Sequence, residues 1–350
     1  MLDLAADPAD LLAAIVDIES VSGNERALAD AVEEALSGCS HLEIWRDGDA
    51  VVASTRQGRP TRVAIAGHLD TVPVKDNLPS RRVGDRLYGR GTADMKGGVA
   101  VALGLAVALD APRHDVTWIF YDHEEVAGDL NGLGRLARVR PEVLAADFAV
   151  LMEPTSARVE GGCQGTSRFE ITTTGRTAHS GRSWLGHNAI HDAAPILDRL
   201  AVYEPRTVVV DGLEYREGLN AVLISGGVAT NVIPDRCTVT INFRFAPDRD
   251  EADARAHVAR LFEGYELVYT DFSPAARPGL DRPAAQEFLA AVGGTASPKY
   301  GWTDVARFSA LGVPAVNYGP ADPALAHTDD EFCPIPDLYA CRDALAAWLS

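Results

Sequence analysis

Four short apolar segments of this chain each lead into an acidic residue or a histidine. Segments of this kind, rich in β-branched and aromatic residues, are typical of buried strands. The carboxyl ends of strands in an open α/β sheet are where ligands bind, so we expect the polar side chains that follow to converge. The segments and these residues are 63–66 with His68, 116–121 with Glu124 and Glu125, 148–152 with Glu153, and 313–318 with His327.

Two further acidic residues fit the same site. Asp70 lies two residues after His68, where its carboxylate can orient the imidazole, although a His-x-Asp pair alone is common by chance. Asp94 lies in a Gly-dense loop, residues 89–98, which leads into an Ala/Val/Leu-rich segment that we expect to be helical, residues 99–109. Strand alternation points His123 away from the site.

Taken alone, Glu124 and Glu125 also fit a solvated acidic loop, but the other candidate ligands favour a metal site. Carboxylates mixed with imidazoles, without thiolates, suit Zn²⁺, Mn²⁺ or Co²⁺. Five ligands are too many for one tetrahedral zinc with an open position and suit two metals that share a carboxylate. The extra glutamate is then available to take a proton from a bridging water.

Composition narrows the class of protein. A chain of 350 residues favours two domains, and a net charge of −18 argues against nucleic acid or an anionic membrane as a partner. Five scattered cysteines without metal-type spacing, and a first stretch without basic residues or a long apolar run, favour the cytoplasm. No GxSxG, Walker A or GxGxxG pattern offers a competing site.

The element pattern is α/β with an interruption. We expect helices over residues 8–18, opened by Asp7 and Pro8, and over about 25–36, capped by Asn24. A different pattern between about 165 and 275 predicts a small four-stranded sheet with two helices on one face. Its expected strands and helices include 168–174, 186–200, 221–228, 237–245 and 251–262, after which α/β signals return at 283–292, 313–318 and 337–349.

Several motifs carry a family resemblance through nearly the whole chain and in order. They are GHLDTVPV, GRGTADMKGG, the Glu-Glu pair, MEPT, GRTAHSGRSWLGHNAIH, TNVIPD with INFRF, and AHTDDE. Together they resemble the di-zinc aminoacylase/carboxypeptidase family of amidohydrolases. The stretches GCQGT, YREGL and KYGWTDVARF are similar to the actinobacterial succinyl-diaminopimelate desuccinylases within that family.

The resemblance implies a fold and a domain division. The expected class is α/β, with a mixed-sheet di-zinc exopeptidase-like catalytic domain over 1–163 and 279–350. An inserted ferredoxin-like α+β domain, residues 164–278, would serve as a lid and mediate homodimerisation. The family also often has a cis peptide between Asp94 and Met95.

It also implies roles for individual residues. His68 and Glu153 would bind one zinc, Glu125 and His327 the other, and Asp94 would bridge them. Asp70 would orient His68, and Glu124 would be the general base. From the partner subunit, His179 would stabilise the oxyanion. Substrate groups would be bound by Asn231, Arg244 and Thr303, and Arg182 fits an acidic acyl tail and a surface position equally well.

The implied reaction is hydrolysis of an amide in a small N-acyl amino acid. The favoured substrate is N-succinyl-L,L-diaminopimelate, which would give succinate and L,L-diaminopimelate for lysine and cell-wall precursor synthesis. An N-acetylornithine deacetylase or related deacylase, or a di-zinc dipeptidase or carboxypeptidase, would keep the same metal ligands. The ligands therefore indicate the reaction type rather than the acyl group.

Overall fold

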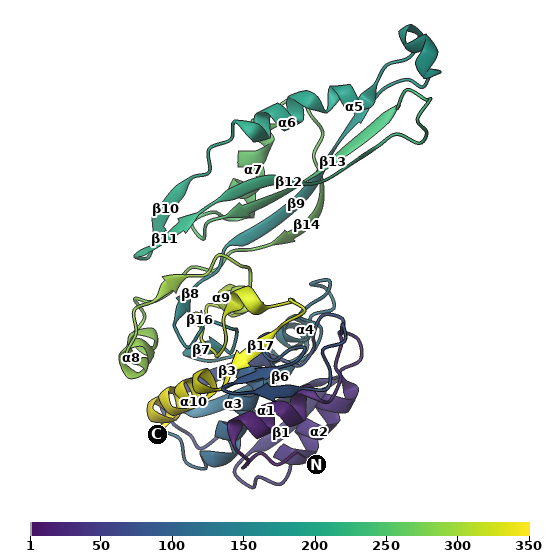
Figure 1. The fold of residues 1–350 in the computed structure, drawn as a ribbon. Helices are drawn as coiled ribbons and strands as arrows, with labels where there is room; N and C mark the ends of the chain where they lie inside the picture. The colour runs from purple at the N-terminus through teal and green to yellow at the C-terminus, as the bar shows by residue number, and fades with distance from the viewer. Residues whose placement is uncertain (1) are drawn as a thin grey trace. The chain divides into compact units, whose positions relative to one another are not determined.

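The computed structural model describes residues 2–350, which form two compact units (Figure 1). The first unit contains the chain up to Gly162 together with Pro278–Ser297 and Asp304–Ser350. The second contains Cys163–Arg277 and Pro298–Thr303, so its chain interrupts that of the first. That these units are a catalytic and a dimerisation domain stays a prediction.

The first unit is built on a mixed sheet with the strand order β1-β2-β6-β3-β7-β16-β8-β15. Its centre is parallel, because β3 pairs in parallel with β6 and β7, and β7 pairs in parallel with β16. The strands are β1 (Glu43–Asp47), β2 (Ala50–Ser54), β3 (Arg62–His68), β6 (Asp115–Tyr121), β7 (Phe148–Leu151), β8 (Glu160–Gly161), β15 (Ser297–Pro298) and β16 (Ala315–Asn317). A smaller sheet, β17-β5-β4, contains β4 (Arg81–Val83), β5 (Arg86–Tyr88) and β17 (Phe332–Pro334).

Apolar helices pack on this sheet and bury its central strands on both faces. Helix α3 contacts β3, and α1 and α10 pack against α3. As predicted, α1 starts at Pro8, with the Asp7 carboxylate accepting from the backbone N–H of Ala9 at 2.9 Å. The helices are α1 (Pro8–Val16), α2 (Arg26–Leu36), α3 (Lys96–Ala108), α4 (Gly132–Val139), α8 (Pro283–Val292), α9 (Val305–Ala310) and α10 (Ile335–Leu349), with 3₁₀ turns at Pro141–Val143 and Pro323–Leu325.

The prediction that Asn24 caps the second helix is wrong. The cap residue of α2 is Glu25, and its side chain makes no capping bond. The Asn24 amide instead donates to the carboxylate of Glu19 at 3.1 Å. Glu25 is fully buried, and its carboxylate accepts from the backbone N–H of His123 instead.

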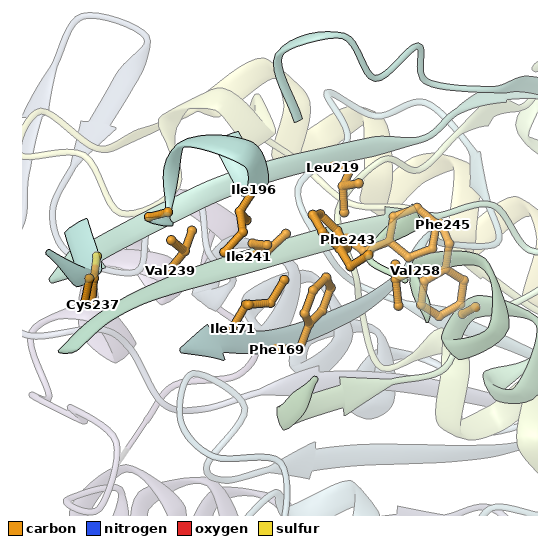
Figure 2. Packing of buried hydrophobic residues seen from close by; sticks show 14 residues of the cluster. Phe169, Ile171, Ile196, Leu219, Cys237, Val239, Ile241, Phe243, Phe245 and Val258 are labelled. Carbon is orange, nitrogen blue, oxygen red and sulfur yellow. The ribbon is translucent and has the colours of Figure 1, made fainter. Parts of the chain in front are cut away.

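The second unit is an antiparallel sheet with the order β12-β13-β9-β14. One apolar face of this sheet, including Phe169, Ile171 and Phe243, packs in a single core with Ile196 of α6 and Val258 of α7 (Figure 2). This is the predicted sheet with helices on one face. Its elements are β9 (Gly165–Thr174), β12 (Gly218–Gly226), β13 (Arg236–Phe245), β14 (Val268–Ser273), α5 (Ala189–Asp192), α6 (Ala194–Ala201), α7 (Glu251–Leu261) and a 3₁₀ segment, Ser180–Leu185.

A hairpin of β10 (Thr207–Val210) and β11 (Leu213–Arg216) lies outside the four-stranded sheet and was not predicted from the sequence. Among residues 2–350, no helix has the length and apolar character needed to cross a membrane.

Candidate metal centre and active site

The parallel strands of the first unit bring the predicted metal ligands to one edge of the sheet. His68 is the last residue of β3, Glu124 and Glu125 follow β6, and Glu153 follows β7. His327 lies beyond β16, after a 3₁₀ turn. Because these four strands run in the same direction, their carboxyl ends deliver all five side chains to that edge.

Asp94 reaches the same place from the loop before α3. The helix can approach the end of β7 because residue 98 is glycine: a Cβ there would lie 2.1 Å from the carbonyl oxygen of Met152. Met152 directly precedes Glu153, so this contact sets how closely the loop of Asp94 can approach Glu153. The peptide bond between Asp94 and Met95 is cis, as the family resemblance implies.

The carboxylate of Asp94 lies between two imidazoles. Its Oδ1 is 3.2 Å from Nε2 of His68, and its Oδ2 is 3.3 Å from Nε2 of His327. The same nitrogen of His327 lies 2.9 Å from Oε1 of Glu125. Asp94 is therefore the residue shared by the two histidines, which is the geometry of a bridging ligand.

Charge interactions within the cluster shift the pKa values of its members. Hydrogen bonds to Asp94 and Glu125 raise the pKa of His327 to about 10. Burial disfavours the charged form of His68, but the hydrogen bond to Asp94 and the nearby carboxylates outweigh it, so its pKa is raised well above 6.5. Burial also opposes ionisation of Asp94, but the two imidazoles lower its pKa overall. The carboxylates thus favour positive charge in their midst.

Glu124 lies in the same cluster with a different electrostatic character. Its pKa is raised well above 4.5, mainly by burial, against the opposing effect of His68, with added repulsion from Asp304 and Glu153. A carboxylate with a raised pKa accepts a proton more readily than an ordinary glutamate does. By distance it could also be a ligand, because Glu124, Glu125 and His68 form one of the groups whose donor atoms lie within 4.8 Å of one another.

The carboxylate of Asp70 holds the turn that carries both glutamates. Its Oδ1 accepts from the backbone N–H of Glu124 at 2.9 Å, and its Oδ2 accepts from that of Glu125 at 3.0 Å. The hydroxyl of Ser22 also donates to Oδ2, at 2.7 Å. Nδ1 of His68 is closest to the main-chain oxygen of Asp70, at 3.0 Å, and lies 3.6 Å from its carboxylate. One residue thus connects the end of β3 with the turn after β6.

Glu25 is a contact of this turn that the sequence analysis missed. Its buried carboxylate accepts from the backbone N–H of His123 at 3.2 Å, so Glu25 and Asp70 together bind three successive N–H groups. His123 has a φ of 59°, the left-handed region that non-glycine residues rarely adopt. Its Nδ1 faces Asp122 at 2.8 Å rather than the metal ligands, as alternation predicts. The Ser-Gly-Asn-Glu stretch at 22–25 gave no signal for this role.

The donor set fits a pair of metal ions. The ligands form two groups, His68 with Asp94 and Glu153, and Asp94 with Glu125 and His327. Within each group the donor atoms lie within 4.8 Å of one another. Imidazole nitrogens and carboxylate oxygens, without a thiolate, suit Zn²⁺, Co²⁺ or Mn²⁺. The shared member of the two groups is Asp94. The site is therefore suited to bind metal.

The other predicted site residues lie in the second unit. His179 is exposed, and its Nδ1 accepts from the backbone N–H of Gly181 at 3.0 Å. Arg182 and Asn231 are also exposed, whereas Arg244 is partly buried, which lowers its pKa, and Thr303 is buried. Their roles toward the metal centre stay predictions.

Comparisons with known proteins agree with this architecture. The model of peptidase family M20/M25/M40 matches residues 64–350. The chain is 55% identical to a putative succinyl-diaminopimelate desuccinylase of Mycobacterium tuberculosis, over 100% of this chain and 99% of that one. It is 46% identical to the succinyl-diaminopimelate desuccinylase of Corynebacterium glutamicum, over 100% of this chain and 98% of that one.

Solved structures share the fold at low sequence identity. Aminopeptidase PepT of Bacillus cereus superposes with a TM-score of 0.79 at 16% identity, covering 99% of each chain. The YxeP protein of Bacillus subtilis, described as a dinuclear metal-binding peptidase, gives a TM-score of 0.73 at 19% identity, covering 99% of this chain and 97% of that one. From the family match and the full-length relatives, the chain belongs to peptidase family M20/M25/M40, a family of hydrolases.

Proposed function

We propose that this chain hydrolyses the amide of N-succinyl-L,L-diaminopimelate to succinate and L,L-diaminopimelate, a step of lysine and cell-wall precursor synthesis. The observation that carries the proposal is the cluster in which Asp94 lies between the buried His68 and the half-exposed His327, beside Glu124. The substrate follows from the two full-length relatives that bear this activity in their names. A cytoplasmic location fits such a substrate.

The proposed cofactor is a pair of zinc ions. His68 and Glu153 would hold one, Glu125 and His327 the other, and Asp94 would be shared by both. Co²⁺ or Mn²⁺ can satisfy the same nitrogen and oxygen donors. When bound, the metal pair lowers the pKa of a coordinated water and polarises the substrate carbonyl.

In the proposed mechanism, Glu124 moves the proton. Its raised pKa suits a carboxylate that takes a proton from water as the water oxygen bonds to the amide carbon. The same proton then goes to the leaving nitrogen as the C–N bond breaks, which releases succinate and the free amine. Asp70 and Glu25 keep Glu124 in place by holding its backbone. We assign oxyanion stabilisation to His179 of the partner subunit.

Substrate recognition is assigned to polar residues of the second unit. Asn231, Arg244 and Thr303 would bind carboxylate or carbonyl groups of the substrate. Arg182 would pair with the carboxylate of the succinyl group, for which a guanidinium offers two parallel donors. An acetylated or dipeptide substrate lacks that carboxylate.

We propose that the protein is a homodimer joined through β12. This strand is an edge of the four-stranded sheet, and its side chains from Asn220 onward are exposed. They include Val222, Leu223 and Ile224, with 50%, 69% and 53% of their surface exposed. A long apolar edge is a template for pairing with another strand. The β12 strand of a second copy can pair with this edge symmetrically.

The Glu124→Gln variant tests the proton transfer. The amide has the shape of the carboxylate but cannot take a proton, so we expect activity to fall by about 10²- to 10⁴-fold. Metal content should equal that of the wild type, because Glu124 is not an assigned ligand. The measurements are turnover of N-succinyl-diaminopimelate and metal analysis, with the exposed Glu34→Gln as control.

These measurements distinguish the role of the base, the set of metal ligands and the choice of substrate. Undiminished turnover in Glu124→Gln contradicts the role of the base, and loss of a metal identifies Glu124 as a ligand. Faster turnover of N-acetylornithine or simple dipeptides by the wild type contradicts the assigned substrate.

Proton release on metal binding tests the protonation of His327. Its pKa is raised from 6.5 to about 10, so in chelator-stripped protein the imidazole is charged at pH 7 and must lose its proton to bind metal. The protonated form stabilises the stripped fold fully below pH 6.5, and this contribution disappears as the pH rises through about 10. We therefore expect metal affinity to increase from pH 7 toward pH 10.

Calorimetric titration with Zn²⁺ in buffers of different ionisation enthalpy measures the protons released. A His327→Gln variant should release fewer protons than the wild type at pH 7. Equal release by the two proteins contradicts the assignment.

Light scattering after size exclusion tests the dimer. We expect Leu223→Lys to shift the protein toward the monomer, because two copies would place the added charges in an apolar edge-to-edge contact. The control is Val209→Lys on β10, where 64% of the side chain is exposed outside the four-stranded sheet. A dimer that persists in Leu223→Lys and dissociates in Val209→Lys places the interface elsewhere.

A further inference from the structure

A buried ion pair contacts the backbone at the candidate metal ligands, and neither of its members is a candidate ligand. The side chains of Arg90 and Glu331 have 4% and 1% of their surface exposed, and Nη1 of Arg90 is 2.8 Å from Oε2 of Glu331. Separating two buried charges is costly, so the pair fixes the segments that carry it.

The small sheet of the first unit explains how these two residues meet. Strands β5 and β17 are antiparallel, with Tyr88 opposite Phe332. The backbone N–H of Gly89 donates to the carbonyl of Glu331 at 3.1 Å, which extends the pairing by one step. Arg90 is the next residue after Gly89, so the register of β5 and β17 places its guanidinium beside the Glu331 carboxylate.

Each member of the pair holds the backbone of a ligand-bearing segment. Oε1 of Glu331 accepts from the N–H groups of Ala93 at 2.9 Å and Asp94 at 3.1 Å. The guanidinium of Arg90 donates to the carbonyl of Thr328 at 3.2 Å, next to His327. It also donates, at 3.2 Å, to the carbonyl of Pro73, in the loop that follows His68.

We infer that the Arg90–Glu331 pair positions Asp94 and His327 relative to the His68 loop, so that one aspartate can serve both metal ions. Three ligand-bearing segments, far apart in the chain, share this one ion pair. It is a positioning element, since neither side chain has a ligand atom in the metal-binding groups of residues 2–350. The inference rests on the proposed metal centre.

The Glu331→Gln variant tests it. A glutamine has one acceptor oxygen, so it can serve the N–H groups of Ala93 and Asp94 or the guanidinium of Arg90, but not both. Loss of an outer partner of a metal ligand typically weakens metal binding by about 10- to 100-fold. We expect a loss of this size for Co²⁺, measured by titration of chelator-stripped protein and by the visible spectrum of the bound ion.

The chain offers a matched control in the second unit. Glu217 is equally buried and is held by Arg206 and Arg249, both at 2.8 Å, and by the N–H of Ala246 at 3.1 Å. It holds no candidate ligand. Glu217→Gln should lower the thermal stability of the stripped protein while leaving Co²⁺ affinity unchanged.

Arg90→Lys is the second variant and remains informative if Glu331→Gln does not fold. Lysine keeps the charge opposite Glu331, but its single nitrogen cannot span the acceptors at residues 73, 328 and 331. We expect weaker Co²⁺ binding here too. Wild-type affinity in the folded variants, or an equal loss in Glu217→Gln, overturns the inference. A wild-type protein that binds no Co²⁺ overturns the proposed function, and the inference with it.

Discussion

The carboxylate of Asp94 sits between His68 and His327, one oxygen toward each, and the rest of the site is organised around this arrangement. Glu124, Glu125 and Glu153 add further negative charge to a largely buried cluster. Like charges at such short distances raise the free energy of the folded chain unless cations or N–H donors offset them. The raised pKa of both histidines is the electrostatic result, whereas burial is the main cause of the raised pKa of Glu124 and the neighbouring carboxylates add to it. Divalent cations would relieve the same repulsion.

The backbone around the cluster is held by carboxylates that belong to none of the proposed ligand groups of residues 2–350. Asp70 and Glu25 bind the turn at His123–Glu125, and Glu331 binds the loop that carries Asp94. Buried carboxylates are usually avoided, yet here each accepts backbone N–H groups that would otherwise be unpaired. The left-handed conformation of His123 belongs to this scheme, because it turns successive N–H groups toward the acceptors.

The parts of this account that the sequence predicted share one physical basis. Apolar segments with polar ends are visible in a sequence, and in parallel strands those ends must meet, so His68, Glu125 and Glu153 could be grouped before the structure was known. Glu25, Arg90 and Glu331 could not be grouped this way. Glu25 and Glu331 accept from backbone N–H groups and Arg90 donates to backbone carbonyls, contacts that leave no pattern in the sequence. Glu331 also lies 241 positions from Arg90. The hairpin of β10 and β11 was missed although its sequence carries a signal: Asp211-Gly212 is a two-residue hairpin turn, and Leu213–Arg216 alternates between apolar and polar residues.

Diffraction at the zinc absorption edge from crystals of the zinc-loaded protein tests whether Asp94 is shared by two metal ions. We expect two anomalous peaks per chain, about 3.5–4 Å apart, with one Asp94 oxygen on each ion. His68 and Glu153 should contact one ion, and Glu125 and His327 the other. A single ion, or a pair bridged by a residue other than Asp94, would show that Asp94 is not shared by two metal ions.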